Sequence, residues 1–188
     1  MRFSSLYVGA LLVLASACSS PQEKAEQEAA SANALAAAGN FEAARQAILK
    51  AVAARDDQPE QWLLLGRMDL ETGRPADALL AYSRVLELDA TNIEALQLVA
   101  ELSFQFGDMR EASSAADRVL ALDPNATRAI LVKGLVALSR KDVPGATAAA
   151  ESILKLKPQD EFGTVLKARA LAVGKDYQGA VNFIEQGV

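Results

Sequence analysis

The chain has 188 residues, of which 51% are hydrophobic, 5% aromatic and 23% charged, and its formal net charge is −5. These proportions exclude a disordered or collagen-like chain, and the dominance of alanine and leucine favours helices that pack through small side chains. The acidic balance and the lack of a dense Lys/Arg cluster leave little to neutralise a phosphate backbone, so we expect no nucleic-acid partner.

Residues 1–17 have the order of a secretory signal peptide. One positive charge at Arg2 precedes an apolar stretch from Leu6 to Leu14, and small residues follow up to Ala17. The apolar stretch is shorter than the ~20 residues that a helix needs to cross a bilayer. We therefore expect this segment to be cleaved and not to remain as a membrane anchor.

Cys18 is the only cysteine, and it lies between the small residues of the signal peptide and a polar segment. This arrangement resembles the lipobox of bacterial lipoproteins, although Ala15 stands where that motif usually has leucine. The resemblance implies that Cys18 is lipidated, that residues 18–24 form a polar tether, and that the protein lies on the periplasmic face of the outer membrane. Because residues 15–17 also fit ordinary signal-peptidase cleavage, a soluble periplasmic protein is the alternative.

A repeat with a period of 34 residues covers residues 25–188. Its units are 25–58, 59–92, 93–126, 127–160 and 161–188, the last of them incomplete. The twentieth position is alanine in every unit, and the eighth is alanine or glycine. Small residues at two fixed positions predict that two helices approach closely in each unit.

Turn and cap residues divide each unit into two predicted helices. Glycine occupies the fifteenth position of the first three units and predicts a left-handed residue after the first helix: Gly39, Gly73 and Gly107. The following position holds residues that we expect to cap the second helix: Asn40, Asp108, Asp142 and Asp176. Each unit is therefore predicted to be a helical hairpin.

The second unit carries the residues that identify the repeat. Its Trp62, Leu65 and Gly66, followed by Ala78 and Tyr82, resemble the tetratricopeptide signature W-x2-L-G with its later small and aromatic positions. The resemblance is weaker in the first, fourth and fifth units, which we expect to be less stable. It implies an all-α fold, a solenoid of antiparallel helix pairs that forms a right-handed superhelix.

The residue inventory argues against catalysis. The chain has no histidine, so it cannot build a Ser-His-Asp site, a Cys-His site or an ordinary zinc site. Phosphate-binding glycine motifs are also missing. We expect no enzyme activity and no metal, cofactor or nucleotide.

The resemblance further implies a protein-binding groove lined by the first helix of each unit. The partner should be amphipathic, with a basic flank toward the net-acidic second and third units and an apolar segment on the mostly apolar fourth and fifth. A clamp for C-terminal carboxylates is disfavoured, since only Asn33 matches it. Alternatively, the apolar groove residues pack only against neighbouring helices. The candidate groove residues are Glu60, Leu63, Arg67, Glu94, Gln97, Glu101, Phe104, Arg128, Leu131, Leu135, Phe162 and Arg169.

These features favour a non-catalytic scaffold for protein–protein interaction, anchored to the bacterial outer membrane and assisting the assembly of an envelope complex such as a pilus or an export system. One alternative is the substrate-recognition arm of an enzyme whose catalytic domain lies beyond residue 188. Another is a soluble periplasmic chaperone, which differs from the scaffold only in the fate of Cys18.

Overall fold

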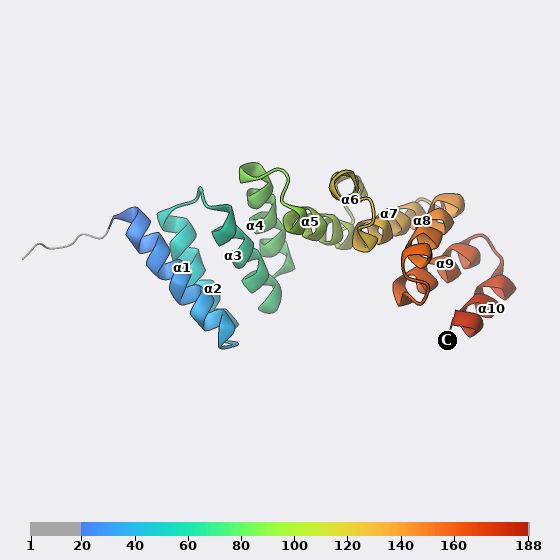
Figure 1. Ribbon diagram of the computed structural model, residues 1–188, viewed down its shortest axis with the longest axis horizontal. Helices are drawn as coiled ribbons and strands as arrows, with labels where there is room; N and C mark the ends of the chain where they lie inside the picture. Colours follow the sequence, from blue (N-terminus) through green and yellow to red (C-terminus); the bar gives the residue numbers. More distant parts are fainter. Residues whose placement is uncertain (1–19, 188) are drawn as a thin grey trace, which may run out of the picture.

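The computed structural model describes residues 20–187, and over that range it is built from α-helices joined by short turns (Figure 1). The predicted signal peptide and Cys18 lie outside the described residues. None of the described helices has the length and apolar character needed to cross a membrane. The helices are α1 (Pro21–Ala37), α2 (Phe41–Ala54), α3 (Pro59–Glu71), α4 (Pro75–Leu88), α5 (Ile93–Gln105), α6 (Met109–Leu122), α7 (Thr127–Ser139), α8 (Val143–Leu156), α9 (Glu161–Val173) and α10 (Tyr177–Gly187).

Consecutive helices pack in pairs, and the pairs follow one another along the long axis of the molecule (Figure 1). The first helices of the second to fifth pairs begin at residues 59, 93, 127 and 161, which is the spacing of the sequence repeat. The predicted all-α solenoid of helix pairs is therefore confirmed.

Helix α1 begins earlier than expected. The Ser20 side chain accepts a hydrogen bond from the Glu23 amide at 3.2 Å, and the Glu23 carboxylate accepts one from the Ser20 amide at 2.9 Å. This reciprocal capping box starts a helix at Pro21. The prediction that residues 18–24 form a tether is therefore wrong for residues 21–24, which are helical.

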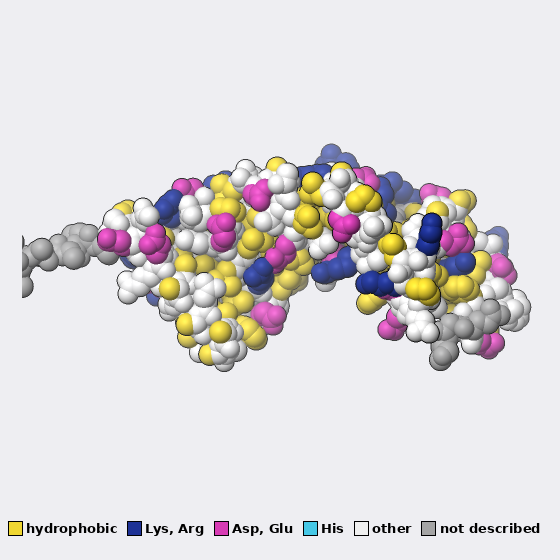
Figure 2. Space-filling view, in the orientation of Figure 1, with side chains coloured by type: hydrophobic (Ala, Val, Ile, Leu, Met, Phe, Trp, Pro, Cys, Tyr) yellow, Lys and Arg dark blue, Asp and Glu magenta, His cyan; other side chains and the backbone are white. Residues whose placement is uncertain are grey.

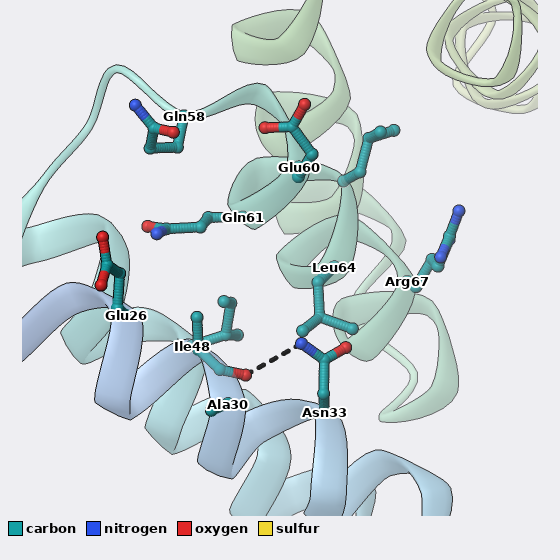
Figure 3. Close-up of a pocket in the computed structure, with 11 residues that line it drawn as sticks. Glu26, Ala30, Asn33, Ile48, Gln58, Glu60, Gln61, Leu64 and Arg67 are labelled. Atoms are coloured by element: carbon teal, nitrogen blue, oxygen red, sulfur yellow. Dashed lines mark hydrogen bonds between the residues drawn. The ribbon is translucent and has the colours of Figure 1, made fainter.

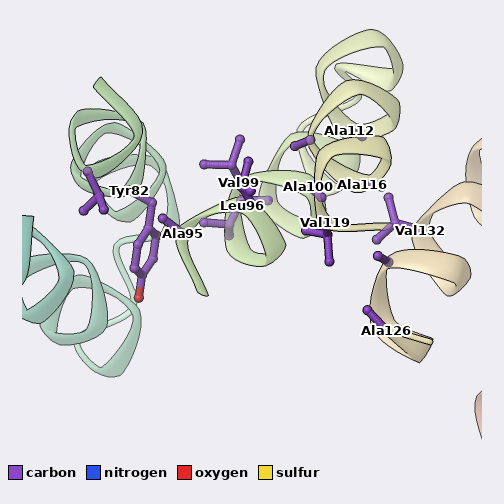
Figure 4. Close-up of a cluster of buried hydrophobic side chains, with 14 of the residues drawn as sticks. Tyr82, Ala95, Leu96, Val99, Ala100, Ala112, Ala116, Val119, Ala126 and Val132 are labelled. Atoms are coloured by element: carbon purple, nitrogen blue, oxygen red, sulfur yellow. The ribbon is translucent and has the colours of Figure 1, made fainter. Parts of the chain in front are cut away.

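The small residues of the repeat lie where neighbouring helices approach most closely. Each alanine at the twentieth position is buried, with at most 8% of its surface exposed. Gly66, at the eighth position, packs against the ring of Tyr82, and a Cβ atom on Gly66 would lie only 2.7 Å from that ring. Tyr82 belongs to a core cluster that continues through Leu96 and Val119 and joins α4 to α7 (Figure 4). The predicted close approach of the helices is confirmed.

The turns between paired helices confirm the expected left-handed residues. Gly39, Gly73 and Gly107 have φ of 75°, 74° and 83°. In the fourth and fifth units the same position holds Lys141 and Lys175, with φ of 60° and 68°. These two lysines adopt a backbone conformation that disfavours any residue with a Cβ atom.

Most of the predicted caps are present. The carboxylates of Asp108, Asp142 and Asp176 accept hydrogen bonds from the amide three residues further on, at 3.0, 3.0 and 2.9 Å. Asn40 makes no such hydrogen bond to α2, so that prediction is wrong.

Candidate protein-binding groove

The first helices of the units line the inner face of the solenoid. Helix α1 contacts α3, α5 contacts α7, and α7 contacts α9, whereas no second helix in the described range packs comparably against the second helix of the next unit. The inner side of a curved array is its shorter side, so equivalent helices of successive units come closest there. The first helices touch one another in this way, and they therefore form the inner side. Figure 2 shows the arched molecule, with its surface hollowed beneath α5, α6 and α7.

The N-terminal part of this face contains a pocket of about 550 Å³ between α1 and α3 (Figure 3). The predicted groove residues Glu60, Leu63 and Arg67 line it. The pocket also includes Glu26 and Gln61, which were not among the predicted residues. Glu26 holds the second position of its unit, as Glu60 does, so the repeat register could have identified it. No pattern in the sequence pointed to Gln61.

Ion pairs between units occupy the middle of the face. Arg67 Nε donates to Glu94 Oε1 at 2.7 Å, and Arg128 Nη2 donates to Glu101 Oε2 at 2.6 Å. Each pair joins the ninth position of one unit to the second position of the next. The hydrogen bond that Arg67 donates to Glu94 raises the pKa of Arg67, as expected for a bonded guanidinium. Gln97, half-buried, lies on α5 between the two pairs in sequence.

These pairs correct the predicted electrostatics of the groove. Glu94 and Glu101 were expected to attract a basic flank of the partner, but an arginine from an adjacent unit neutralises each of them. The two carboxylates of the third unit are therefore not free to receive the predicted basic flank of the partner. Glu26 and Glu60, which belong to no ion pair in the described range, lie at the N-terminal pocket.

The C-terminal part of the face is apolar and partly accessible. Phe162 and Val165 on α9 are 65% and 45% exposed, and Arg169 is exposed with no ion-pair partner among residues 20–187. Leu131 and Leu135 are half-buried against the small core cluster around Ile153 and Leu166.

Phe104 and Leu63, both predicted groove residues, pack against the central core cluster. Packing against neighbouring helices thus accounts for part of the predicted apolar set, and Phe162 is the most accessible member of the remainder.

A buried ion pair joins the first unit to the second on the other side of α3. Arg45 Nε lies 2.5 Å from Asp69 Oδ1, and Asp69 is only 1% exposed. Burial raises the pKa of Asp69 even though Arg45 acts in the opposite direction. Among residues 20–187 no group of three or more potential ligands could hold a metal ion. The enclosed Asp69 carboxylate thus joins α3 to α2.

Two tetratricopeptide-repeat family models match the chain, one at residues 29–93 and the other at residues 69–136. Together they span more than half of the sequence, and the chain belongs to the tetratricopeptide-repeat family. Proteins built from this repeat generally mediate protein–protein interactions.

Solved structures with the same fold are similar over most of their length. A MamA protein superposes with a TM-score of 0.80 at 24% identity and covers 88% of this chain and 90% of its own. YrrB, described as a tetratricopeptide-repeat protein with an unusual peptide-binding site, gives 0.76 at 14% identity, over 87% of this chain and 84% of its own. PilF of Pseudomonas aeruginosa superposes with a TM-score of 0.68 at 20% identity, over 90% of this chain and 79% of its own. No curated protein sequence matches.

Proposed function

We propose that this chain is a scaffold that binds a segment of a partner protein along its inner face while a lipid on Cys18 holds it at the bacterial outer membrane, where it assists the assembly of an envelope complex. The observation that carries the binding role is the apolar surface at the C-terminal part of the face. Phe162 is 65% exposed there, beside the exposed Val165 and the exposed Arg169, which has no ion-pair partner within residues 20–187. Exposed apolar surface of this kind marks interaction sites.

The envelope setting rests on the sequence. Cys18 follows a signal-like segment and begins a polar stretch, as lipidated cysteines do. The peptide-binding site in the description of YrrB, which shares this fold, supports a segment as the ligand and not a large flat surface.

Site-specific photo-crosslinking in the source bacterium tests the binding role. A photo-reactive residue at Phe162 should form an adduct with one partner protein. The same residue at Leu80 should not, although Leu80 on α4 is 70% exposed and belongs to a second helix. With the partner identified, Phe162→Glu should weaken binding about tenfold or more, as expected for a central apolar contact, and Leu80→Glu should not. Equal effects of the two variants, with helicity intact in both, would place the interface elsewhere.

The anchoring role has its own test. The full chain should fractionate with membranes and incorporate labelled fatty acid, and Cys18→Ala should lose the label and move to the soluble periplasm. Cys18 is the only cysteine, so no other thiol can take its place. Membrane retention of Cys18→Ala without label would refute lipid anchoring.

A further inference from the structure

The pocket between α1 and α3 has an apolar floor and acidic walls. Ala29, Ala30, Ile48 and Leu64 provide the floor, and Glu26 on α1 and Glu60 on α3 provide the carboxylates. Its volume of about 550 Å³ lies within the range of pockets that take small ligands or long side chains. This combination suits a ligand that is apolar along its length and charged at its end.

The arginines near the pocket do not compensate its carboxylates. Arg67, at one end, is paired with Glu94. Arg55 is close enough to Glu26 for the acid to affect its pKa, but it donates to Asp57 at 2.8 and 3.0 Å and lowers the pKa of Asp57 to about 2.

Neither Glu26 nor Glu60 belongs to an ion pair among the described residues, and Glu26 accepts only a hydrogen bond from Gln22 at 2.9 Å. The pocket therefore carries uncompensated negative charge.

A buried acceptor in the same pocket has no donor. The side-chain oxygen of Gln61 is shielded from solvent and has no hydrogen-bond partner within residues 20–187. Figure 3 shows the Gln61 amide between Glu26 and Gln58, at the end of the pocket opposite Arg67. A buried acceptor without a hydrogen bond lowers the stability of the fold. If the Gln61 amide rotates so that its oxygen faces the pocket, a donor in the pocket can supply that hydrogen bond.

We propose that this pocket binds a lysine or arginine side chain of the partner segment. The aliphatic stem lies against Ala29, Ile48 and Leu64, and the charged head lies between Glu26 and Glu60, where it donates to the Gln61 oxygen. Such side chains routinely bury their stems while keeping the charged end with polar groups. The inference rests on the proposed function, because the cation belongs to the segment bound along the inner face.

The test uses small mimics of the two side chains. Butylguanidinium and butylammonium are titrated into the full chain, labelled with ¹³C at its methyl groups, and butylurea serves as the uncharged mimic. The methyl signals of Ala29, Ala30 and Ile48 should shift in a saturable way with the cations and not with butylurea. Glu26→Gln together with Glu60→Gln should weaken cation binding at least about fivefold, as expected for the loss of two partly screened charges.

A matched variant controls for net charge. Glu161→Gln together with Glu185→Gln changes the net charge equally, and both residues are exposed and lie outside the pocket. Its cation affinity should equal that of the wild type. The proposal is overturned if the cations do not saturate these methyl signals, if butylurea binds equally well, or if both double variants lose the same affinity.

Binding of the mimics and crosslinking at Phe162 test the cation pocket and the inner-face interaction separately. Phe162→Glu should leave binding of the mimics unchanged, because α9 lies far along the array from α1 and α3 (Figure 1). Crosslinking at Phe162 without binding of the mimics would overturn the cation pocket alone. Binding of the mimics without crosslinking would overturn the proposed inner-face interaction, and with it the assignment of the cation to a partner segment.

Discussion

The buried pair of Arg45 and Asp69 should dominate the coupling between the first and second units. Arg45→Leu leaves Asp69, which is 1% exposed, without its nearest cation. Removing one partner of a buried ion pair typically costs about 3 to 5 kcal/mol. We expect the lower end of that range, because Asp69 already has a raised pKa and can limit the loss by taking up a proton.

Replacing both partners should restore most of the lost stability. Leu35 and Leu171 occupy the position of Asp69 in the first and fifth units, and Leu79 occupies that of Arg45 in the second. The double variant Arg45→Leu with Asp69→Leu therefore installs side chains that this repeat already accepts. The free energy of unfolding of the double variant should lie within about 1 kcal/mol of the wild-type value, since well-packed apolar replacements of buried ion pairs are often neutral.

Urea denaturation followed by circular dichroism measures these changes, with hydrogen exchange of α2 and α3 amides as a local readout, because units of a solenoid can unfold separately. Arg84→Leu is the control: its partners Asp56 and Glu87 are 70% and 64% exposed, so its loss should be small. The reasoning is refuted if Arg45→Leu costs no more than Arg84→Leu, or if the double variant is no more stable than Arg45→Leu alone.

Three further outcomes follow from single residues. Lys141→Gly and Lys175→Gly should each raise the free energy of unfolding by about 0.5 to 1 kcal/mol, because relief of left-handed strain exceeds the added flexibility of the unfolded chain; denaturant midpoints that fall would contradict this. Tyr82→Phe removes a buried hydroxyl without a partner in the described range, and thermal denaturation should show equal or greater stability, whereas a loss above about 1 kcal/mol would reveal an unrecognised partner. The folded pKa of Asp69 is raised, so the stability of the wild type relative to Asp69→Asn should be greatest below the unfolded pKa of about 3.9 and fall as the pH rises through the folded value; a pH series of urea midpoints with the opposite slope would contradict it.

The helical hairpins were predictable because their signals are local. Gly39, Gly73 and Gly107 act through their own φ angles, and Asp108 caps an amide only three residues away. Ser20 and Glu23 also signal the start of α1 locally, although the resemblance of Cys18 to a lipobox predicts a polar tether over the same residues.

The candidate groove was predictable in outline and not in its charges. Its residues follow from the repeat register, but Arg67 and Glu94 are 27 residues apart, and each alone predicts only an exposed charge. The pairing exists because stacking brings the ninth position of one unit against the second position of the next. Phe104 and Phe162 were both predicted for the groove, but Phe104 packs against the core and Phe162 is exposed. Their packing neighbours, and not their positions in the repeat, decide this difference.

The sequence by itself determined the repeat period, the paired helices and the small residues at their contacts, because each depends on spacing along one short segment. Only the tertiary structure decided which carboxylates lack an ion pair among the described residues, that the buried Gln61 oxygen has no donor in that same part of the chain, and where the inner face changes from a charged pocket to an apolar surface. Those properties depend on distances between units, and the distances arise from how much each helix pair rotates against the next.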